Sequence, residues 1–298
     1  GKLEDGRLLV ILMGDDHSMP SHKTAEICPL SHLADLRDQR PDDPARGFLY
    51  AEETPYNHIY NAALKYVYSI PESLRHTLQD SDPDNRVTMQ ALQAKPCFSQ
   101  APQASSLIYS TVQTRRVPVI FNDTAMNCDG FKTRIDERDP AVPAAVDRLR
   151  QDFALTVDTG RPISAAAPAG IALRNAVMVE RALEAAQKTQ ARIIVQSCGL
   201  GHVFGEELLR VLYHHSLAAQ FEAAGARVLP VFLTSEIDNY TPERTLEEAA
   251  LTSHPNSIVI RGLDDERHFK CNPEAERAYL ARLTDSYSGA ACPFAPDN

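Results

Sequence analysis

A glycine-rich segment after an apolar run holds the residues whose spacing most clearly suggests chemistry. Residues 193–195 are the short apolar run of a strand covered on both faces, and glycines follow at positions 199, 201 and 205. Glycine lets the backbone turn tightly and approach a ligand without a Cβ atom in the way. Because free backbone N–H groups at a helix start bind anions, the segment is a candidate site for a phosphate or diphosphate.

The glycine spacing departs from two familiar phosphate-binding motifs. No Gly-Lys-Ser or Gly-Lys-Thr closes the segment as a P-loop requires, and Gly205 comes one residue too late for the dinucleotide motif. A strand-to-helix turn that needs glycine for geometry alone is therefore an equal alternative. We expect Cys198, next to the segment, to be a small packed residue rather than a nucleophile.

Histidines give little indication of a metal site. His214 and His215 are adjacent on a predicted helix over 206–224, so we expect them to point to different faces and to make a poor metal pair. His17 lies near Asp15, where a polar turn is the expected explanation. No His, Cys or carboxylate spacing resembles a zinc or calcium site.

Strands and helices alternate in the second half of the chain, where they would position the glycine segment. Helical patterns at 171–190 and 206–224 flank a strand at 192–196, and a further strand follows at 227–233. This alternation predicts a parallel or mostly parallel sheet with helices on its faces. The other expected elements are strands at 7–13, 107–109, 117–121, 163–168 and 257–260, a helix at 56–68, a loop or short helix at 31–46 and a surface insertion near 78–105.

Composition places the chain among globular proteins. Its 298 residues are 43% hydrophobic and 23% charged, with no linker and no internal repeat, so a single α/β domain over 1–298 is expected. The net charge of −10 argues against nucleic acid or an anionic membrane as a partner, and no apolar run is long enough for a transmembrane helix. Six cysteines without a C-x-x-C pair predict reduced thiols in a cytosolic setting, and the first residues show no signal-peptide pattern.

Three segments, in order, resemble the microbial poly(ADP-ribose) glycohydrolase branch of the macrodomains. Residues 107–110 with 117–123 are similar to that family's IYS…VPVFRDD stretch. Residues 163–168 are similar to its ITSPAPN stretch, and residues 194–205 are similar to its LVLGAWGCGVFGN stretch. The resemblance implies an α/β, macrodomain-like three-layer sandwich with a mixed, mostly parallel sheet and helices on both faces. It implies no cofactor and no metal.

The resemblance also implies site residues. The family's loop wraps the diphosphate of ADP-ribose, and its catalytic signature is a triple glycine followed by Gln-Glu-Glu. The nearest match to that signature is 45–53, which makes Glu52 and Glu53 catalytic candidates, although Ala45 and Arg46 replace glycines. The alternative is that the two glutamates open a helix, where negative charge suits the dipole. The ligand-binding residues implied are Gly199, Gly201, His202, Val203, Phe204 and Gly205.

A second acidic group competes for the catalytic role. Asp123 and Asp129 follow the predicted strand at 117–121, and ligands of α/β proteins bind at such strand ends. Either carboxylate could hold ribose hydroxyls or act as the acid or base. For Asp136 and the acidic residues after it, Asx-turns in a solvated loop are expected.

The expected function is an ADP-ribosyl hydrolase that removes ADP-ribose from a modified protein or from ADP-ribose chains. The expected partner is ADP-ribose or an ADP-ribosylated protein, and the expected location is the cytoplasm, or a host cytoplasm into which a bacterial effector is secreted. The altered glycine segment at 45–47 favours an alternative, a catalytically inactive ADP-ribose reader. A nucleotide-processing enzyme of another α/β family is the third possibility.

Overall fold

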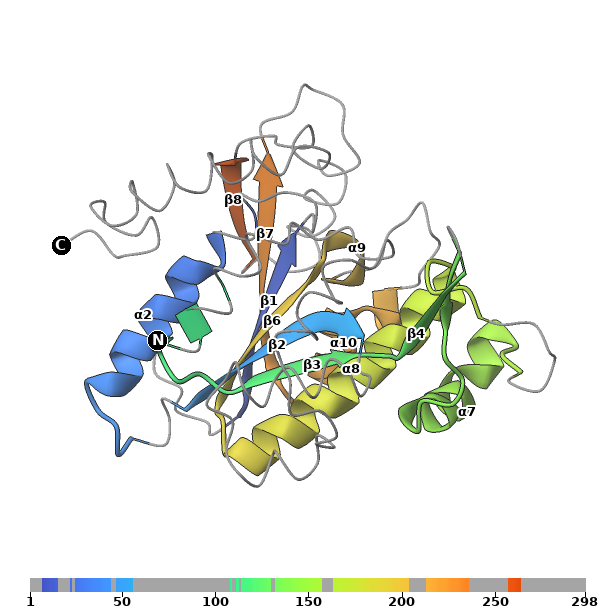
Figure 1. Ribbon diagram of the computed structural model, residues 1–298, viewed down its shortest axis with the longest axis horizontal. Coiled ribbons are helices and arrows are strands. Elements are labelled where there is room, and N and C mark those ends of the chain that lie inside the picture. Colours follow the sequence, from blue (N-terminus) through green and yellow to red (C-terminus); the bar gives the residue numbers. More distant parts are fainter. Residues whose placement is uncertain are drawn as a thin grey trace.

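A six-stranded sheet organises the part of the chain that the structure describes. The computed structural model describes residues 7–15, 22, 25–43, 47–55, 108, 111–112, 114–129, 132–156, 163–203, 213–235 and 257–263. The strand order is β3-β2-β6-β1-β7-β8, and every pairing in this sheet is parallel (Figure 1). The strands are β1 (Leu9–Asp15), β2 (Phe48–Pro55), β3 (Val119–Asp123), β6 (Ile193–Gly199), β7 (Arg227–Ser235) and β8 (Ile258–Leu263).

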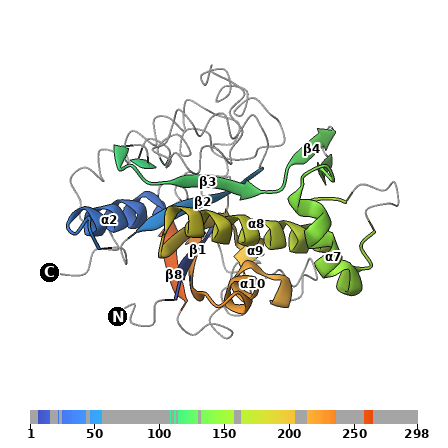
Figure 2. The same cartoon turned by 90° about the horizontal axis from the view of Figure 1, so that it is seen from below.

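Helices cover both faces of the sheet. On β2, Tyr50 donates a hydrogen bond to Glu26 beside α2, whereas Asn122 of β3 donates to the Met178 carbonyl of α8. Figure 2 shows α8 running along the sheet with α10 beside it and α7 near its end. The predicted α/β class with helices on both faces is confirmed. The helices are α2 (Ile27–Asp38), α7 (Ala141–Phe153), α8 (Pro168–Thr189), α9 (Leu200–Val203) and α10 (Leu217–Ala223), with a 3₁₀ turn η4 (Tyr213–His215) and a hairpin of β4 (Met126–Asp129) and β5 (Lys132–Ile135).

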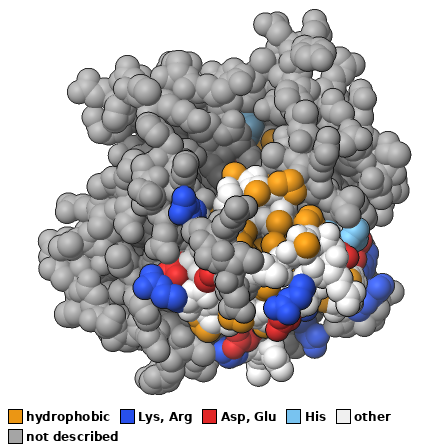
Figure 3. Space-filling view, turned by 90° about the vertical axis from the view of Figure 1, so that its right-hand side faces the viewer, with side chains coloured by type: hydrophobic (Ala, Val, Ile, Leu, Met, Phe, Trp, Pro, Cys, Tyr) orange, Lys and Arg blue, Asp and Glu red, His pale blue; other side chains and the backbone are white. Residues whose placement is uncertain are grey.

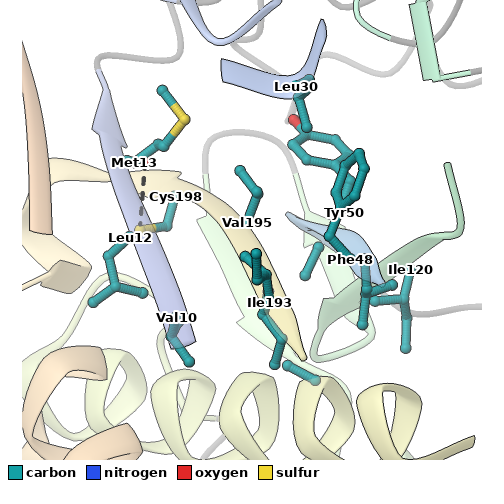
Figure 4. Close-up of a cluster of buried hydrophobic side chains, with 14 of the residues drawn as sticks. Val10, Leu12, Met13, Leu30, Phe48, Tyr50, Ile120, Ile193, Val195 and Cys198 are labelled. Atoms are coloured by element: carbon teal, nitrogen blue, oxygen red, sulfur yellow. Dashed lines mark hydrogen bonds between the residues drawn. The ribbon is translucent and has the colours of Figure 1, made fainter. Parts of the chain in front are cut away.

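The main core lies between the sheet and the helices on its two faces. Its central strands β1 and β6 are apolar on both faces, as parallel strands covered by helices must be. Figure 4 shows Leu30 of α2 beside the Tyr50 ring, and Leu12 and Met13 of β1 pointing in opposite directions. A second cluster packs α7 against α8 around Val146. Figure 3 shows apolar side chains at the centre of one face, with charged side chains toward its lower edge.

Several predicted elements differ from the structure. The expected strand at 163–168 is a turn with one isolated bridge from Ser164 to Arg134, because α8 begins at its Pro168. Residues 27–38 form the helix α2, so the first part of the segment expected to be a loop or short helix is helical. In the predicted strand at 107–109, Ile108 is helical.

One further prediction is corrected, and others are confirmed or lie outside the described residues. The predicted helix over 206–224 is interrupted, since η4 and Ser216 precede α10. Gly225 adopts a φ of +86° just past the end of α10, as expected of a helix-terminating glycine. The helix at 56–68 and the insertion near 78–105 lie outside the described residues. Among the helices described, none is long and apolar enough to cross a membrane.

Candidate active site

Polar groups from three neighbouring strands meet at one edge of the sheet. Glu53 lies near the end of β2, Asp123 ends β3 and Gly199 ends β6. Because these strands are parallel, their carboxyl ends lie at the same edge, where α/β proteins bind ligands. The second turn of α8 adds Arg174 and Asn175 to this edge, and α9 adds His202, as their hydrogen bonds show.

The guanidinium of Arg174 bridges two buried carboxylates. Its Nε lies 3.1 Å from both oxygens of Asp123, its Nη2 lies 2.7 Å from Asp123 Oδ2, and Nη2 also contacts Glu53 Oε1. Burial opposes the charge of Arg174, but the charges of Asp123 and Glu53 outweigh that effect and raise the pKa of the guanidinium. One positive charge therefore pairs with two carboxylates.

Glu53 accepts hydrogen bonds from several directions. Its Oε2 accepts a 2.6 Å hydrogen bond from the Gly199 backbone N–H, and its Oε1 lies 3.2 Å from His202 Nε2. The side chains of Glu53 and His202 are only 7% and 8% exposed, so water screens this pair little. A carboxylate that receives donors on both oxygens is held in one orientation.

The orientation of His202 is fixed by Asn175. The Asn175 amide donates from Nδ2 to the His215 carbonyl at 2.8 Å, which turns its Oδ1 toward His202 Nδ1 at 2.5 Å. Because Oδ1 only accepts, Nδ1 of His202 must carry the hydrogen. A neutral ring would then point the lone pair of Nε2 at the carboxylate of Glu53. At 3.2 Å, His202 Nε2 and Glu53 Oε1 are close enough to exchange a proton.

A buried amide pair supports the strand ends beneath this cluster. Asn122 Nδ2 lies 2.6 Å from Gln196 Oε1, and Gln196 Nε2 lies 3.3 Å from Asn122 Oδ1. The pair joins β3 to β6 across β2, where the small Ala51 stands in register with Gln196. This link fixes the spacing of β3 and β6, the two strands on either side of β2 that present Asp123 and Gly199.

Glu52 and Glu53 point to opposite faces of the sheet. Both lie in the strand β2, so the alternative that they open a helix is wrong. Side chains alternate along a strand, which places Glu52 on the face of Tyr50. On that face Glu26 accepts hydrogen bonds of 3.0 Å from the Tyr50 hydroxyl and the Ser197 hydroxyl. Of the two glutamates, only Glu53 contacts Arg174 and His202.

The structure separates Asp123 from Asp129. Asp123 joins Glu53 through Arg174, whereas the backbone of Asp129 pairs with Lys132 in the β4–β5 hairpin. Asp136 forms the expected turn, accepting from the Arg138 N–H at 3.1 Å.

Asp139 does not lie in the solvated loop that we expected. It is buried and accepts hydrogen bonds from Arg181 at 2.5 Å and from the Ala125 N–H at 2.8 Å. Arg181 also donates to the Asp123 carbonyl at 2.5 Å. The Asp139–Arg181 pair therefore anchors the backbone of Asp123.

The glycine segment lies only partly within the described residues. Gly199 ends β6, and Gly201, His202 and Val203 belong to α9, so a helical turn follows the strand at once. Phe204 and Gly205 lie outside the described residues. Cys198 is buried in the main core, as expected of a packed small residue.

Arg174 and Asn175 are site residues that the sequence analysis did not select. They stand side by side in the first turns of α8, among buried apolar residues such as Leu173 and Ala176. A polar pair on an otherwise apolar helix face is a usable signal, because polar side chains are buried only when they have partners. Their partners, however, come from four other elements of the fold, which are β2, β3, α9 and η4.

Comparison with known proteins identifies no family. No family model matches the chain, and no curated protein matches it. Two solved structures are similar to parts of the fold. One is a cofacial heme-binding ChaN of Campylobacter jejuni, 11% identical, covering 81% of this chain and 86% of that chain with a TM-score of 0.36. The other is the type III effector HopBA1, 16% identical, covering 87% and 88% with a TM-score of 0.39.

Proposed function

We propose that this chain is a hydrolase with Glu53 and His202 as its acid–base pair, and that its substrate is an ADP-ribosyl linkage. The observation that carries the first part is the Glu53 carboxylate, held at the carboxyl edge of the sheet by His202, Arg174 and the Gly199 N–H. A histidine and a carboxylate within proton-transfer distance are the groups that general acid–base catalysis needs.

In this proposal His202 starts with a proton on Nε2 and Glu53 starts as a carboxylate. His202 gives its Nε2 proton to the leaving atom as the bond to the anomeric carbon breaks. Glu53 takes a proton from the attacking water, whose oxygen forms the new bond to that carbon. The proton then passes from Glu53 to His202 across their 3.2 Å contact, which restores the starting state. The negative charge of Glu53 also stabilises the oxocarbenium-like sugar.

The substrate part of the proposal rests on the resemblance of residues 107–235 to the glycohydrolase macrodomains. The segment around Gly201 would hold the diphosphate, because backbone N–H groups at a helix start favour anions. The modified partner would be an ADP-ribosylated protein, in the cytoplasm or in a host cytoplasm reached by secretion.

A release assay combined with a ligand panel tests the two parts separately. The full chain is incubated with an ADP-ribosylated protein, and free ADP-ribose is measured by mass spectrometry. Calorimetry with ADP-ribose, AMP and NAD then ranks the ligands. Release with a preference for ADP-ribose supports both parts. Binding without release identifies a reader module, and a preference for another ligand overturns the substrate class.

A further inference from the structure

A histidine pair and a carboxylate meet on the opposite side of Asn175 from His202. Asp152 lies in the last turn of α7, and His214 and His215 lie in the turn η4. The Asp152 Oδ2 atom is 3.0 Å from His215 Nε2 and 3.7 Å from His214 Nε2. One ligand atom of each residue lies within 4.8 Å of the others. Figure 3 shows a histidine next to acidic side chains at the surface of the face it draws.

The buried member of this group has an unsatisfied nitrogen. His215 is 5% exposed, and its Nε2 makes no hydrogen bond although Asp152 Oδ2 is close. The His215 ring is packed against Phe153, with 4.9 Å between ring centroids, and its carbonyl is held by Asn175. The ring is therefore held in place with its Nε2 beside Asp152 Oδ2.

We propose that Asp152, His214 and His215 bind a divalent transition-metal ion, with Zn²⁺ the best match. Two imidazole nitrogens and one carboxylate oxygen are ligands that Zn²⁺ prefers. In a tetrahedral zinc site the ligand atoms are about 3.3 Å apart, given metal–ligand distances of about 2.0–2.1 Å. The observed 3.0 and 3.7 Å bracket that separation, so small side-chain rotations complete the site. Three protein ligands leave a fourth position for water.

The expectation that His214 and His215 lie on an α-helix and point to different faces is wrong. His214 and His215 lie in the 3₁₀ turn η4, before Ser216 and α10. Their ring centroids are 3.9 Å apart, and both rings face Asp152. The exposed His214 and Asp152, at 59% and 45%, give an ion access from solvent.

Metal titration of the chelator-treated full chain tests this site. Zn²⁺ is followed by calorimetry, and Co²⁺ by the absorption bands of tetrahedral coordination. We expect one ion per chain at this site and a higher melting temperature with Zn²⁺, because a ligand that binds the native state stabilises it. His214→Ala and Asp152→Asn should each weaken binding by at least about 10–100-fold, the loss typical even of outer-shell changes. His32→Ala, which removes an exposed histidine of α2, is the matched control.

The outcomes separate a metal site from a simple ion pair. His214 is exposed, so His214→Ala is expected to fold, and a circular dichroism spectrum checks this. Zn²⁺ affinity that is equal in the parent, His214→Ala and Asp152→Asn would overturn the proposal, as would a parent that binds neither ion. None of these measurements depends on turnover, so the result is independent of the proposed hydrolase.

Discussion

Gly199 donates its backbone N–H to Glu53 Oε2 at 2.6 Å, so the last amide of β6 is satisfied by a carboxylate of the protein itself. The glycine segment was predicted to bind an anion, and at its first glycine the anion is a side chain from the neighbouring strand. This contact, together with Arg174, fixes the carboxylate that we assign to catalysis. The segment therefore contributes to the site by positioning Glu53 as well as by the ligand contacts proposed for Gly201.

The first prediction concerns the catalytic carboxylate. Glu53→Gln should lower turnover by about 10²–10⁴-fold, because the amide keeps the shape of the side chain but cannot take a proton. The affinity for ADP-ribose should change only a few-fold. Release of ADP-ribose and calorimetry measure the two effects.

Two other acidic residues provide controls for that variant. Glu52→Gln changes the adjacent residue on the opposite face of β2, so its turnover should stay within a few-fold of the parent. Asp123→Asn tests the competing carboxylate. If Asp123→Asn abolishes turnover while Glu53→Gln does not, the catalytic role belongs to Asp123.

The second prediction concerns the imidazole of His202. Nuclear magnetic resonance of ¹⁵N-labelled histidine should show a hydrogen on His202 Nδ1, because that atom faces the carbonyl oxygen of the Asn175 amide at 2.5 Å. Asn175→Leu removes this acceptor and should lower kcat more than it raises KM, since the ring loses its orientation. The exposed His32 serves as the reference signal. A bare Nδ1 in the parent would contradict the assigned geometry.

The third prediction concerns the buried cation. Arg174→Met leaves the carboxylates of Glu53 and Asp123 without their shared partner and should cost about 3–5 kcal/mol of unfolding free energy. Arg148→Met is the control, because Arg148 pairs with Glu180 at the surface and such pairs contribute about 0–1 kcal/mol. Urea denaturation measures both. Equal losses of unfolding free energy in the two variants would show that the buried Arg174 bridge stabilises the fold no more than the surface pair does.

The fourth prediction concerns the start of α8. A Cβ at Gly170 would lie 1.9 Å from the Ser164 carbonyl oxygen, so Gly170→Ala must displace the turn that leads to Arg174. We expect a loss of about 1–3 kcal/mol in stability and a fall in turnover. Gly225→Ala meets no atom within 4 Å but keeps a φ of +86°, so it should cost about 1–2 kcal/mol through backbone strain alone. Turnover at a temperature where both variants are folded distinguishes them, because only Gly170→Ala should lower it.

Local pattern was enough to predict much of the sheet. Buried parallel strands are short apolar runs, and β1, β3, β6 and β7 all follow from such runs. The strand prediction for 163–168 was wrong because the alanines of this segment fit a strand or a turn equally well. The segment forms a turn because α8 begins at Pro168.

The candidate site was harder to predict from the sequence than the sheet. Glu53 was selected through a degraded motif, but its contact with Arg174 spans 121 positions of the chain. Such a contact depends on where α8 crosses the strand ends, which no local pattern specifies. The separation of Glu52 from Glu53 could have been predicted once 48–55 was assigned to a strand, since neighbouring side chains on a strand alternate.

Asn175 has one further consequence, because its single planar amide contacts both His202 and the backbone of η4. If the His215 carbonyl shifts, the Asn175 amide either moves with it or loses this hydrogen bond. If the amide moves, the His202 imidazole that it contacts is displaced as well. The binding of an ion at η4 and the orientation of the His202 ring would then be energetically coupled. By reciprocity, whatever an ion at η4 does to ligand affinity at the strand ends, that ligand does to ion affinity by the same factor.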